Sequence, residues 1–527
     1  MSEDGMPGQR HQSDSHDGAK VVFVVPKTLV KAAKLVLEKH ESFDRSHGIC
    51  PEPRDANLPP KEQRMRVHTT IPYLPSDHKD ISAKSREGEL IAKITNGIPE
   101  DIEISYRKPS KTDTSIISAG HNPLKKAVRE ALEALPDSSL DLITEGSRHA
   151  DIDSLVRRFP DSYSIYKPLL LLPANAVGAW ATLIHKYPAV LEQVWSHVAR
   201  AFNCTHIALN HPIPPSNSST SAHHRDSDNI LRSPVDLTPV CGDFGPYPTP
   251  RSLTSPSRMD FETTLWVTTR QNFIHQTWAP RYTMFSRGNV KEKARLLSLP
   301  SVTSSVTPVS KDSPGATAVD LYAGIGYFSF SYRRAGFKRV LCWELNPWSV
   351  EGLRRGAKLN HWTTRVFAAA DVPRQDAEES EWKAWAESVV RGEEDFWVFA
   401  MSNETAGRIL HCLRNYVPPI RHVNLGLLPV SRLSWPSAVR AVDRKLGGWV
   451  HAHENVGLVE MEERKVEVET EFQRLADECA LDNWAVVGDA NGEERKVRLE
   501  HVEKVKMYAP GVVHAVFDVC ISGTRVV

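Results

Sequence analysis

The chain has 527 residues, in which 65 lysines and arginines balance 65 aspartates and glutamates. This length allows two or three domains with complete cores, and the neutral net charge gives no general indication of nucleic-acid binding. No apolar run approaches the roughly 20 residues of a membrane span, and residues 1–20 lack a signal-peptide core. The seven cysteines form no Cys-x-x-Cys pair, which argues against structural zinc. We therefore expect a cytoplasmic protein with reduced thiols and no metal.

The first part of the chain predicts a disordered tail at residues 1–19 and an N-terminal domain at 20–140. Within this domain, residues 21–25 predict a strand and 29–40 an amphipathic helix. Residues 51–86 are rich in Pro, Lys and Asp, which predicts an irregular connection. Basic residues dominate 84–129, a pattern that suits RNA phosphates but is also common on a solvated surface.

Residues 141–299 predict an α+β connector domain that contacts RNA. Residues 190–202 have helical spacing and 206–209 read as a strand, while 212–228 and 245–258 resemble loop insertions. Two apolar segments, 263–269 and 273–278, predict a hairpin.

The turn that follows the hairpin combines a glycine, a helix start and several polar groups. Gly288 permits the turn, Asn289 is a favourable N-cap, and Glu292 completes a capping-box pattern. These residues would present Ser286, Arg287 and Lys293 at the mouth of a helix. The pattern fits an anion site and a capped connector with exposed charges equally well.

After an expected linker at 300–315, the domain at 316–527 contains the most informative stretch, residues 319–330. It predicts a buried strand ending at Asp320, a turn opened by Gly324 and Gly326, and a helix, an arrangement in which backbone N–H groups meet a ligand. The next strand ends in Glu344, where a doubly wound sheet presents an acid to a ribose. Ser329 replaces the third glycine of the dinucleotide fingerprint, which favours S-adenosylmethionine over NAD. The alternative is a cofactor-free sheet whose glycines only pack helix on strand.

Two segments compete for the third strand of this domain: 365–370, ending in Asp371, and 396–401, ending before Asn403 and Glu404. Tryptophans and small apolar residues between 382 and 390 have the spacing of a core helix face. Further strands are expected at 422–428, 448–456, 499–507 and 513–521, the last two as an antiparallel pair. The predicted fold is α/β, a class I methyltransferase-like doubly wound sheet with an antiparallel last strand, preceded by smaller α+β domains.

The chain resembles the tRNA wybutosine-synthesizing protein 2 family, which is related to the tRNA guanine-N1 methyltransferases. The matching segments are residues 278–289, 320–328, 343–347, 424–429, 447–454 and 508–511. The resemblance implies transfer of the 3-amino-3-carboxypropyl group of S-adenosylmethionine to the C7 carbon of 4-demethylwyosine at position 37 of tRNA(Phe), with release of methylthioadenosine. It implies no obligate protein partner.

The resemblance also suggests roles for individual residues. Ser286 and Lys293 would hold the methionine arm of the cofactor, Glu344 would accept the ribose hydroxyls, and Arg287 and Asn424 would position the substrate. The spacing of strands in the family makes the strand of Asn424 the fourth, which leaves residues 361–395 as an insertion. For contact with the adenine edge, Asn403 and Glu404 are therefore preferred to Asp371. No general base is identified, and core asparagines that satisfy the backbone remain the alternative for Asn403 and Asn424. The implied cofactor-binding set is Ser286, Lys293, Asp320, Gly324, Gly326, Glu344, Asn403 and Glu404.

Two other functions use the same sequence features. A tRNA (guanine-N1) methyltransferase would share the scaffold and the cofactor but transfer the methyl group. A non-catalytic RNA-binding protein would keep the fold with a vestigial pocket, against which Asp320, Gly324, Gly326 and Glu344 argue.

Overall fold

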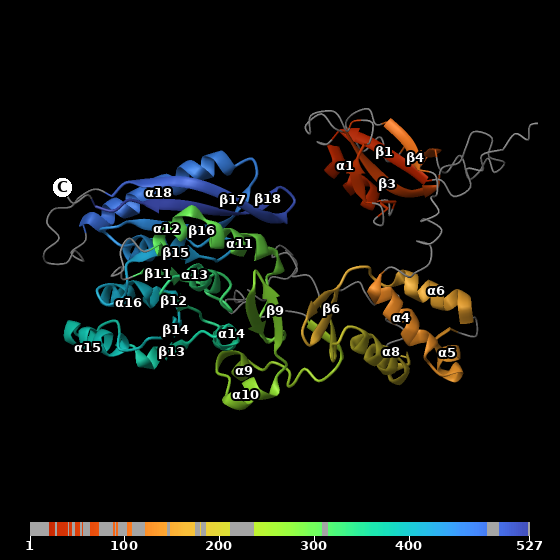
Figure 1. Cartoon of the computed structure of the whole chain (residues 1–527), viewed down its shortest axis with the longest axis horizontal. Coiled ribbons are helices and arrows are strands. Elements are labelled where there is room, and N and C mark those ends of the chain that lie inside the picture. Colours follow the sequence, from red (N-terminus) through yellow and green to blue (C-terminus); the bar gives the residue numbers. More distant parts are fainter. Residues whose placement is uncertain are drawn as a thin grey trace, which may run out of the picture. The chain divides into compact units, whose positions relative to one another are not determined.

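The structure of the protein is a computed structural model (Figure 1). It describes residues 237–307, 315–481 and 495–524 without a break, and before residue 237 the segments 20–26, 29–39, 42–44, 48–52, 64–72, 103–107, 122–144, 148–173 and 186–210 with residues 55, 88, 89, 91, 92 and 180. The expected tail at 1–19 and the insertion at 212–228 lie outside the described residues. The chain divides into two compact units, residues 1–126 and 127–527.

The first unit contains a four-stranded antiparallel sheet in the order β2-β3-β1-β4. Its core is formed by alternate residues of the central strand β1, among them Val21 and Phe23, packed against Leu37 of the helix. The expected strand and helix are confirmed, but residues 51–86 are not wholly irregular. They contain β3, whose Val67 and Ile71 are buried, because the prolines and lysines that suggested a connection flank this strand. The elements are β1 (Lys20–Pro26), α1 (Val30–Lys39), β2 (Ile49–Pro51), β3 (Arg64–Pro72) and β4 (Glu103–Arg107).

The second unit begins with helices and a small mixed sheet in the order β5-β6-β7-β8. The expected helix and strand are confirmed as α8 and β7. The domain boundary expected at residue 140 falls inside α5, and the division into domains remains a prediction. The elements are α4 (Pro123–Glu133), α5 (Asp137–Thr144), α6 (Arg148–Arg158), β5 (Ser164–Tyr166), β6 (Leu169–Pro173), α8 (Pro188–Ala201), β7 (His206–Asn210) and β8 (Leu237–Cys241).

A hairpin and four short helices lead to the large sheet. The hairpin is confirmed as β9 and β10. Two segments expected to be irregular contain helices: α9 begins with a capping box between Thr249 and Ser252, and α12 occupies the start of the expected linker with Val302 fully buried. The elements are α9 (Pro250–Thr254), α10 (Arg258–Thr263), β9 (Val267–Gln271), β10 (Ile274–Trp278), η4 (Arg287–Asn289), α11 (Val290–Ser298) and α12 (Pro300–Val306).

The large sheet has eight strands in the order β13-β14-β12-β11-β15-β16-β18-β17. The first six are parallel, and β18 and β17 are antiparallel to their neighbours. This topology confirms the doubly wound sheet with its antiparallel last strands. The strands are β11 (Thr317–Asp320), β12 (Arg339–Trp343), β13 (Thr364–Ala368), β14 (Phe396–Ala400), β15 (Ile420–Leu425), β16 (Gly448–Gly457), β17 (Val497–Ala509) and β18 (Val512–Ile521).

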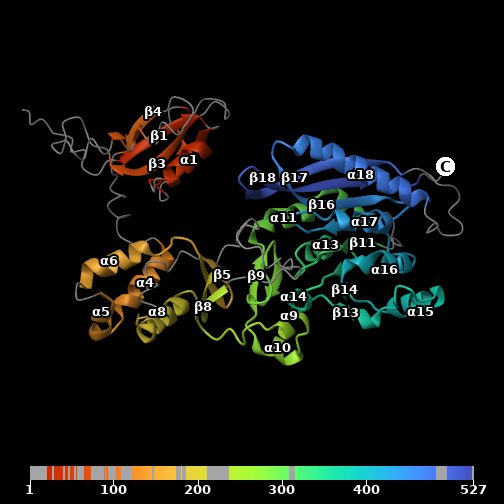
Figure 2. The same cartoon turned by 180° about the vertical axis from the view of Figure 1, so that it is seen from behind.

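Helices cover both faces of this sheet, as Figures 1 and 2 show. Apolar residues of α11, α12, α13 (Ser329–Ala335) and α14 (Pro347–Leu359) form a core on one face. On the other face the core is formed by α15 (Glu379–Val389), α16 (Ala406–Leu413), α17 (Trp435–Ala441) and α18 (Met461–Leu481). Trp382, Ala386 and Val389 of α15 are buried there, which confirms the expected core helix.

The competition for the third strand is resolved by the register. β14 pairs directly with β12, whereas β13 is an edge strand beyond β14. Residues 361–395 therefore add an edge strand and α15 to the sheet.

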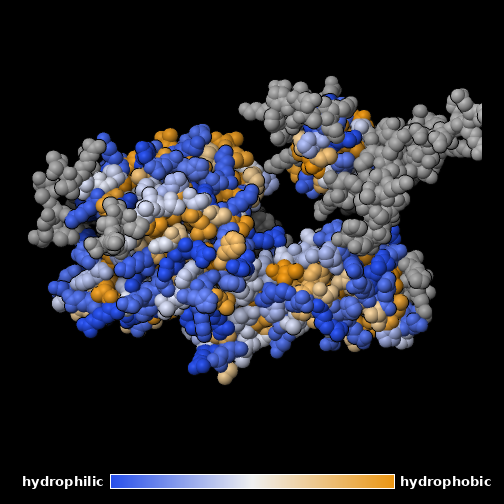
Figure 3. Space-filling model, in the orientation of Figure 1, coloured by the Kyte–Doolittle hydropathy of each residue, from blue (hydrophilic) through white to orange (hydrophobic). Residues whose placement is uncertain are grey.

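On the face of the molecule that Figure 3 shows, hydrophilic residues predominate among the coloured residues and apolar residues lie between them. In the part of the chain that the structure describes, no helix combines the length and apolar character needed to cross a membrane.

Candidate cofactor-binding site

The loop between β11 and α13 is shaped by two glycines. Gly324 and Gly326 have φ angles of +55° and +87°, a region that side chains other than glycine rarely adopt. A Cβ at Gly326 would lie 2.6 Å from the ring of Phe330, so the backbone here also packs closely against its own helix. The glycines therefore serve local geometry, whether or not a ligand is bound.

Glu344, at the end of β12, closes the loop. Its Oε2 accepts a hydrogen bond from the Gly324 N–H at 2.8 Å, and its Oε1 accepts one from the Asn346 N–H at 2.8 Å. Burial raises the pKa of Glu344 to about 7, because desolvation penalises the charged carboxylate more than these two donors stabilise it. The side chain keeps partial exposure beside the loop. The Glu344 carboxylate can thus accept further hydrogen bonds at the position that the sequence predicts for a ribose.

Asp320 lies fully buried at the end of β11. Its Oδ2 accepts a 2.7 Å hydrogen bond from the Ser329 hydroxyl, and its Oδ1 accepts one of 3.1 Å from the Asn424 amide. Burial raises its pKa, and the Ser329 and Asn424 donors oppose that shift. Ser329 occupies the position of the absent third glycine and ties α13 to β11.

The strand β14 brings Asn403, not Asp371, to the loop. The Asn403 amide donates a 2.9 Å hydrogen bond to the carbonyl of Leu321, next to Asp320. Asp371 follows the edge strand β13, is exposed, and accepts a hydrogen bond from the Ala368 N–H. Glu404 is exposed.

The turn between β10 and α11 docks on the same loop through Tyr327. The Ser286 N–H donates to the Tyr327 hydroxyl at 3.3 Å, and that hydroxyl donates to the Met284 carbonyl at 2.6 Å. Arg287 is exposed and donates instead to the Ser164 hydroxyl of β5, at 2.6 Å. Ser286 therefore lies near the loop, whereas Arg287 contacts the small sheet.

Lys293 is the most unusual group of the site, because it is a buried cation held only by neutral partners. Its ammonium donates to the amide oxygen of Gln276 at 2.8 Å and to that of Gln271. It also lies 5.4 Å from the ring centre of Phe285 and 5.6 Å from that of Tyr327. Burial lowers the pKa of Lys293 to about 7, and no described acidic side chain makes an ion pair with it.

The expected capping box at this turn is wrong. Asn289 precedes α11 but its side chain makes no capping hydrogen bond. Glu292 is 1% exposed and pairs with Arg295 at 2.8 Å, so it serves the interior and not the helix end. The side chain of Lys293 is also buried, whereas the sequence pattern predicted that it would lie at the mouth of the helix.

Most of the predicted site residues meet at the carboxyl ends of β11, β12, β14 and β15, which is where open α/β sheets bind ligands. Sequence reasoning missed Tyr327, which joins the two loops, and the two glutamines that hold Lys293. The signal for Gln276 was a single amide side chain between the two apolar ends of strand β10, Ile274 and Trp278. The residues brought together are Ser286, Lys293, Asp320, Gly324, Gly326, Glu344, Asn403 and Asn424.

The sheet order, the glycine loop and the acid after β12 define a class I methyltransferase-like protein. Residues 274–396 match the family described as the TRM5/TYW2 methyltransferase domain. The tRNA wybutosine-synthesizing protein 2 of Schizosaccharomyces pombe is 35% identical over 364 residues, which cover 68% of this chain and 72% of that protein. The chain belongs to the tRNA wybutosine-synthesizing protein 2 family.

A second curated relative agrees with this assignment. The protein of the same name from Saccharomyces cerevisiae is 31% identical over 334 residues, covering 60% of this chain and 59% of that one. A crystal structure of P. horikoshii TYW2 in complex with MeSAdo is 17% identical, covers 76% of this chain and 99% of that chain, and has a TM-score of 0.42.

Proposed function

We propose that the protein transfers the 3-amino-3-carboxypropyl group of S-adenosylmethionine to the C7 carbon of 4-demethylwyosine at position 37 of tRNA(Phe), releasing methylthioadenosine. Membership of the family supports this proposal. The observation that carries it is Lys293, a buried ammonium with neutral partners beside the glycine loop.

S-adenosylmethionine supplies a sulfonium whose three attached carbons are all electrophilic. Which carbon reacts depends on which one the protein directs at the nucleophile. Transfer of the longest substituent requires that the protein hold the amino acid end of that arm in a fixed direction. A buried cation suits this task, because its interaction with a carboxylate is strong where water is excluded.

The remaining residues fit the rest of the same molecule. Glu344 offers carboxylate oxygens to a ribose diol, and Gly324 and Gly326 let the backbone approach without side chains. Asn403, held against the Leu321 carbonyl, keeps its amide oxygen for the adenine edge. Ser286 presents a hydroxyl that caps nothing in η4 and is thus available to the methionine arm.

For the substrate side we propose Asn424 and Arg287. Asn424 is fully buried and bonded to Asp320. It therefore positions the modified base indirectly, by fixing the carboxyl ends of β11 and β15. Arg287 is exposed and suits a phosphate of the tRNA. A carbon nucleophile on an electron-rich ring needs alignment more than a strong base, and no residue is assigned as a general base.

Product analysis tests the proposal. The protein is incubated with S-adenosylmethionine and tRNA(Phe) that carries 4-demethylwyosine, and the small-molecule product is identified by mass spectrometry. Methylthioadenosine with a tRNA heavier by one aminocarboxypropyl group is the expected result. S-adenosylhomocysteine with a tRNA heavier by one methyl group would instead establish the methyltransferase alternative.

The choice of tRNA is tested in the same assay. Unmodified tRNA(Phe) with guanine at position 37 serves as the matched control, because only the tricyclic base offers the acceptor carbon. Equal turnover on both substrates would reject the proposed acceptor.

A further inference from the structure

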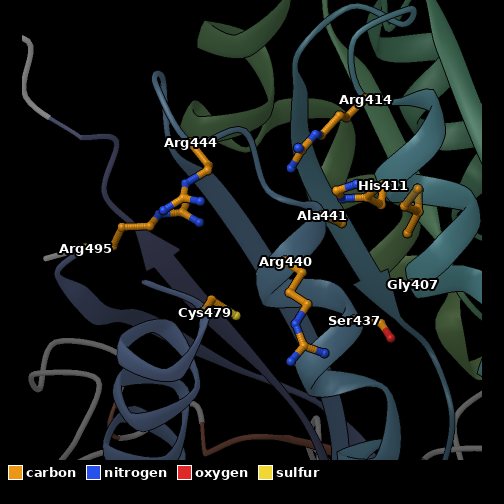
Figure 4. A pocket seen from close by; sticks show the side chains of 10 residues that line it. Gly407, His411, Arg414, Ser437, Arg440, Ala441, Arg444, Cys479 and Arg495 are labelled. Carbon is orange, nitrogen blue, oxygen red and sulfur yellow. The ribbon is translucent and has the colours of Figure 1, made fainter. Parts of the chain in front are cut away.

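A basic pocket lies on the face of the sheet opposite to Lys293. It is formed between α16 and α17, with contributions from the end of α18, from Arg444 in the segment after α17 and from Arg495, two residues before β17. Figure 4 shows arginine side chains reaching it from several elements. The described residues that line it include no aspartate or glutamate; they are Gly407, Leu410, His411, Arg414, Ser437, Arg440, Ala441, Arg444, Cys479 and Arg495.

Arg495 forms the floor of this pocket. It is 3% exposed, and its guanidinium donates to the carbonyls of Ser522 at 3.1 Å, Val439 at 3.4 Å and Asp443 at 3.1 Å. All three acceptors are neutral carbonyls, and the negative charge of Asp443 also favours the charged guanidinium. Burial, and next the charge of Arg444, lower the pKa of Arg495 to about 10.

Arg444 brings a second positive charge to the same place. In Figure 4 the guanidinium groups of Arg444 and Arg495 point toward one another. Oδ1 of Asp443 accepts hydrogen bonds from the N–H groups of Lys445 at 3.0 Å and Leu446 at 2.7 Å, and its negative charge opposes the lowering of the Arg495 pKa only in part. Two guanidinium groups that repel each other in a partly dry pocket are stabilised by an anion placed between them.

The size of the pocket restricts the anion. Its cavity volume is about 40 Å³, against the roughly 10–15 Å³ that one water molecule requires. That space takes a group of a few oxygens around one central atom and not a whole nucleotide. The planar fork of arginine matches the oxygens of a phosphate with two parallel hydrogen bonds.

We propose that the pocket between α16 and α17 binds a phosphate group between Arg444 and Arg495. The phosphate belongs either to the backbone of a bound RNA or to a free phosphate ion. The first source rests on the proposed function, whereas the second is independent of it.

Calorimetric titration with sodium phosphate at constant ionic strength tests the pocket itself. The wild-type chain should bind phosphate but not acetate, and Arg444→Gln should weaken phosphate binding at least about tenfold, since a charge-assisted pair is lost. Arg334→Gln is the matched control, because Arg334 is an exposed arginine at the end of α13, outside the pocket. Ser437→Asp, which adds a negative charge to the pocket wall, should abolish phosphate binding even if Arg444→Gln fails to fold.

The salt dependence of tRNA binding identifies the source of the phosphate. If RNA supplies it, Arg444→Gln and Ser437→Asp should reduce the slope of log K against log salt by about 1, the value for one phosphate contact. If a free ion supplies it, the slope should not change while phosphate binding is lost. The proposal is overturned if the variants alter neither phosphate binding nor the slope. Methylthioadenosine formation is measured in parallel, so a failure of the proposed reaction is recognised separately.

Discussion

The amide of Asn424 donates a 3.1 Å hydrogen bond to the carboxylate of Asp320, and this contact joins the carboxyl ends of the neighbouring parallel strands β11 and β15. Both side chains are fully buried. The second oxygen of Asp320 accepts the Ser329 hydroxyl, so the acid links two strands and the helix that follows the glycine loop. Asp320 therefore fixes the helix that follows the glycine loop, while Glu344 binds the backbone of the loop itself at Gly324.

Replacement of Asn424 by alanine should weaken both the fold and the cofactor site. It removes one of the donors that offset the burial of Asp320, a loss of about 1–3 kcal/mol in the free energy of unfolding. Urea denaturation measures that loss, and equilibrium titration measures the accompanying fall in S-adenosylmethionine affinity. Asn455→Ala is the control: the amide oxygens of Asn424 and Asn455 both lack a partner among the described residues, but of the two only Asn424 donates to a buried carboxylate, so the loss of Asn455 should cost less. Equal stability of the two variants would contradict the role of Asn424.

Lys293→Met should separate recognition of the methionine arm from recognition of the nucleoside. The variant keeps a long unbranched side chain but removes the buried ammonium, so affinity for S-adenosylmethionine should fall at least about tenfold. Affinity for methylthioadenosine, which lacks the aminocarboxypropyl arm, should stay within about twofold of wild type. Lys291→Met is the control, since Lys291 lies exposed on the same helix. An equal loss of affinity for both ligands would mean that Lys293 supports the nucleoside pocket as a whole.

The sequence predicted the central part of the large sheet well because β11, β12 and β14 are short, mainly apolar runs that end in or lead to polar residues. Asp320 and Glu344 were found because an acid at the end of a buried strand is visible without any tertiary information. Lys293 was singled out as a site residue, which stays a prediction, but its environment was not predicted. Its burial depends on Gln271 and Gln276 in a separate hairpin, and pairing between distant segments leaves no local pattern.

The same limitation explains the errors. The capping box failed because Glu292 is drawn to Arg295, which in turn contacts Asp518 from the last strand of the chain. Local propensity would favour the cap, but Glu292 pairs with Arg295, and Arg295 is held in the interior by Asp518, more than two hundred positions away. The arginines around Arg495 were not singled out either, because they come from separate helices and connecting segments and converge only in the folded chain.

Affinity for S-adenosylmethionine should be greatest near pH 7. Burial raises the pKa of Glu344 to about 7 and lowers that of Lys293 to about 7 in the unliganded protein. Below this pH Glu344 must release a proton to accept ribose hydroxyls, and above it Lys293 must gain one to bind a carboxylate. The dissociation constant should therefore rise up to about tenfold per pH unit on either side.

Two variants identify the group responsible for each side of this pH dependence. Glu344→Gln should remove the rise of the dissociation constant below pH 7 and keep the rise above it. Lys293→Met should remove the rise above pH 7 and keep the rise below it. Titrations between pH 5.5 and 8.5 provide the measurement. A wild-type profile without a maximum would show that neither group changes its protonation state on binding.

Asp518 should be a major contributor to the stability of the large unit, through contacts that connect α11 to the sheet. Its Oδ2 accepts from Arg295 at 2.5 Å and its Oδ1 accepts from His451 at 2.6 Å, and His451 in turn contacts His422 at 2.9 Å. Burial alone would raise the pKa of Asp518, but the charges and hydrogen bonds of His451 and Arg295 hold it well below its usual range. Asp518→Ala leaves Arg295 buried without this partner and should cost about 3–5 kcal/mol at pH 7.

The pH dependence of that cost distinguishes a charged contact from simple packing. Because the folded pKa of Asp518 is depressed, its contribution is complete above the unfolded pKa of about 4 and is lost as pH falls further. The stability difference between wild type and Asp518→Ala should therefore shrink below about pH 4, as measured by urea denaturation. Glu262→Ala, which breaks the exposed pair with Arg258, should cost less than about 1 kcal/mol at any pH. A difference for Asp518→Ala that stays constant down to pH 2 would show that the carboxylate charge does not stabilise the contact with α11.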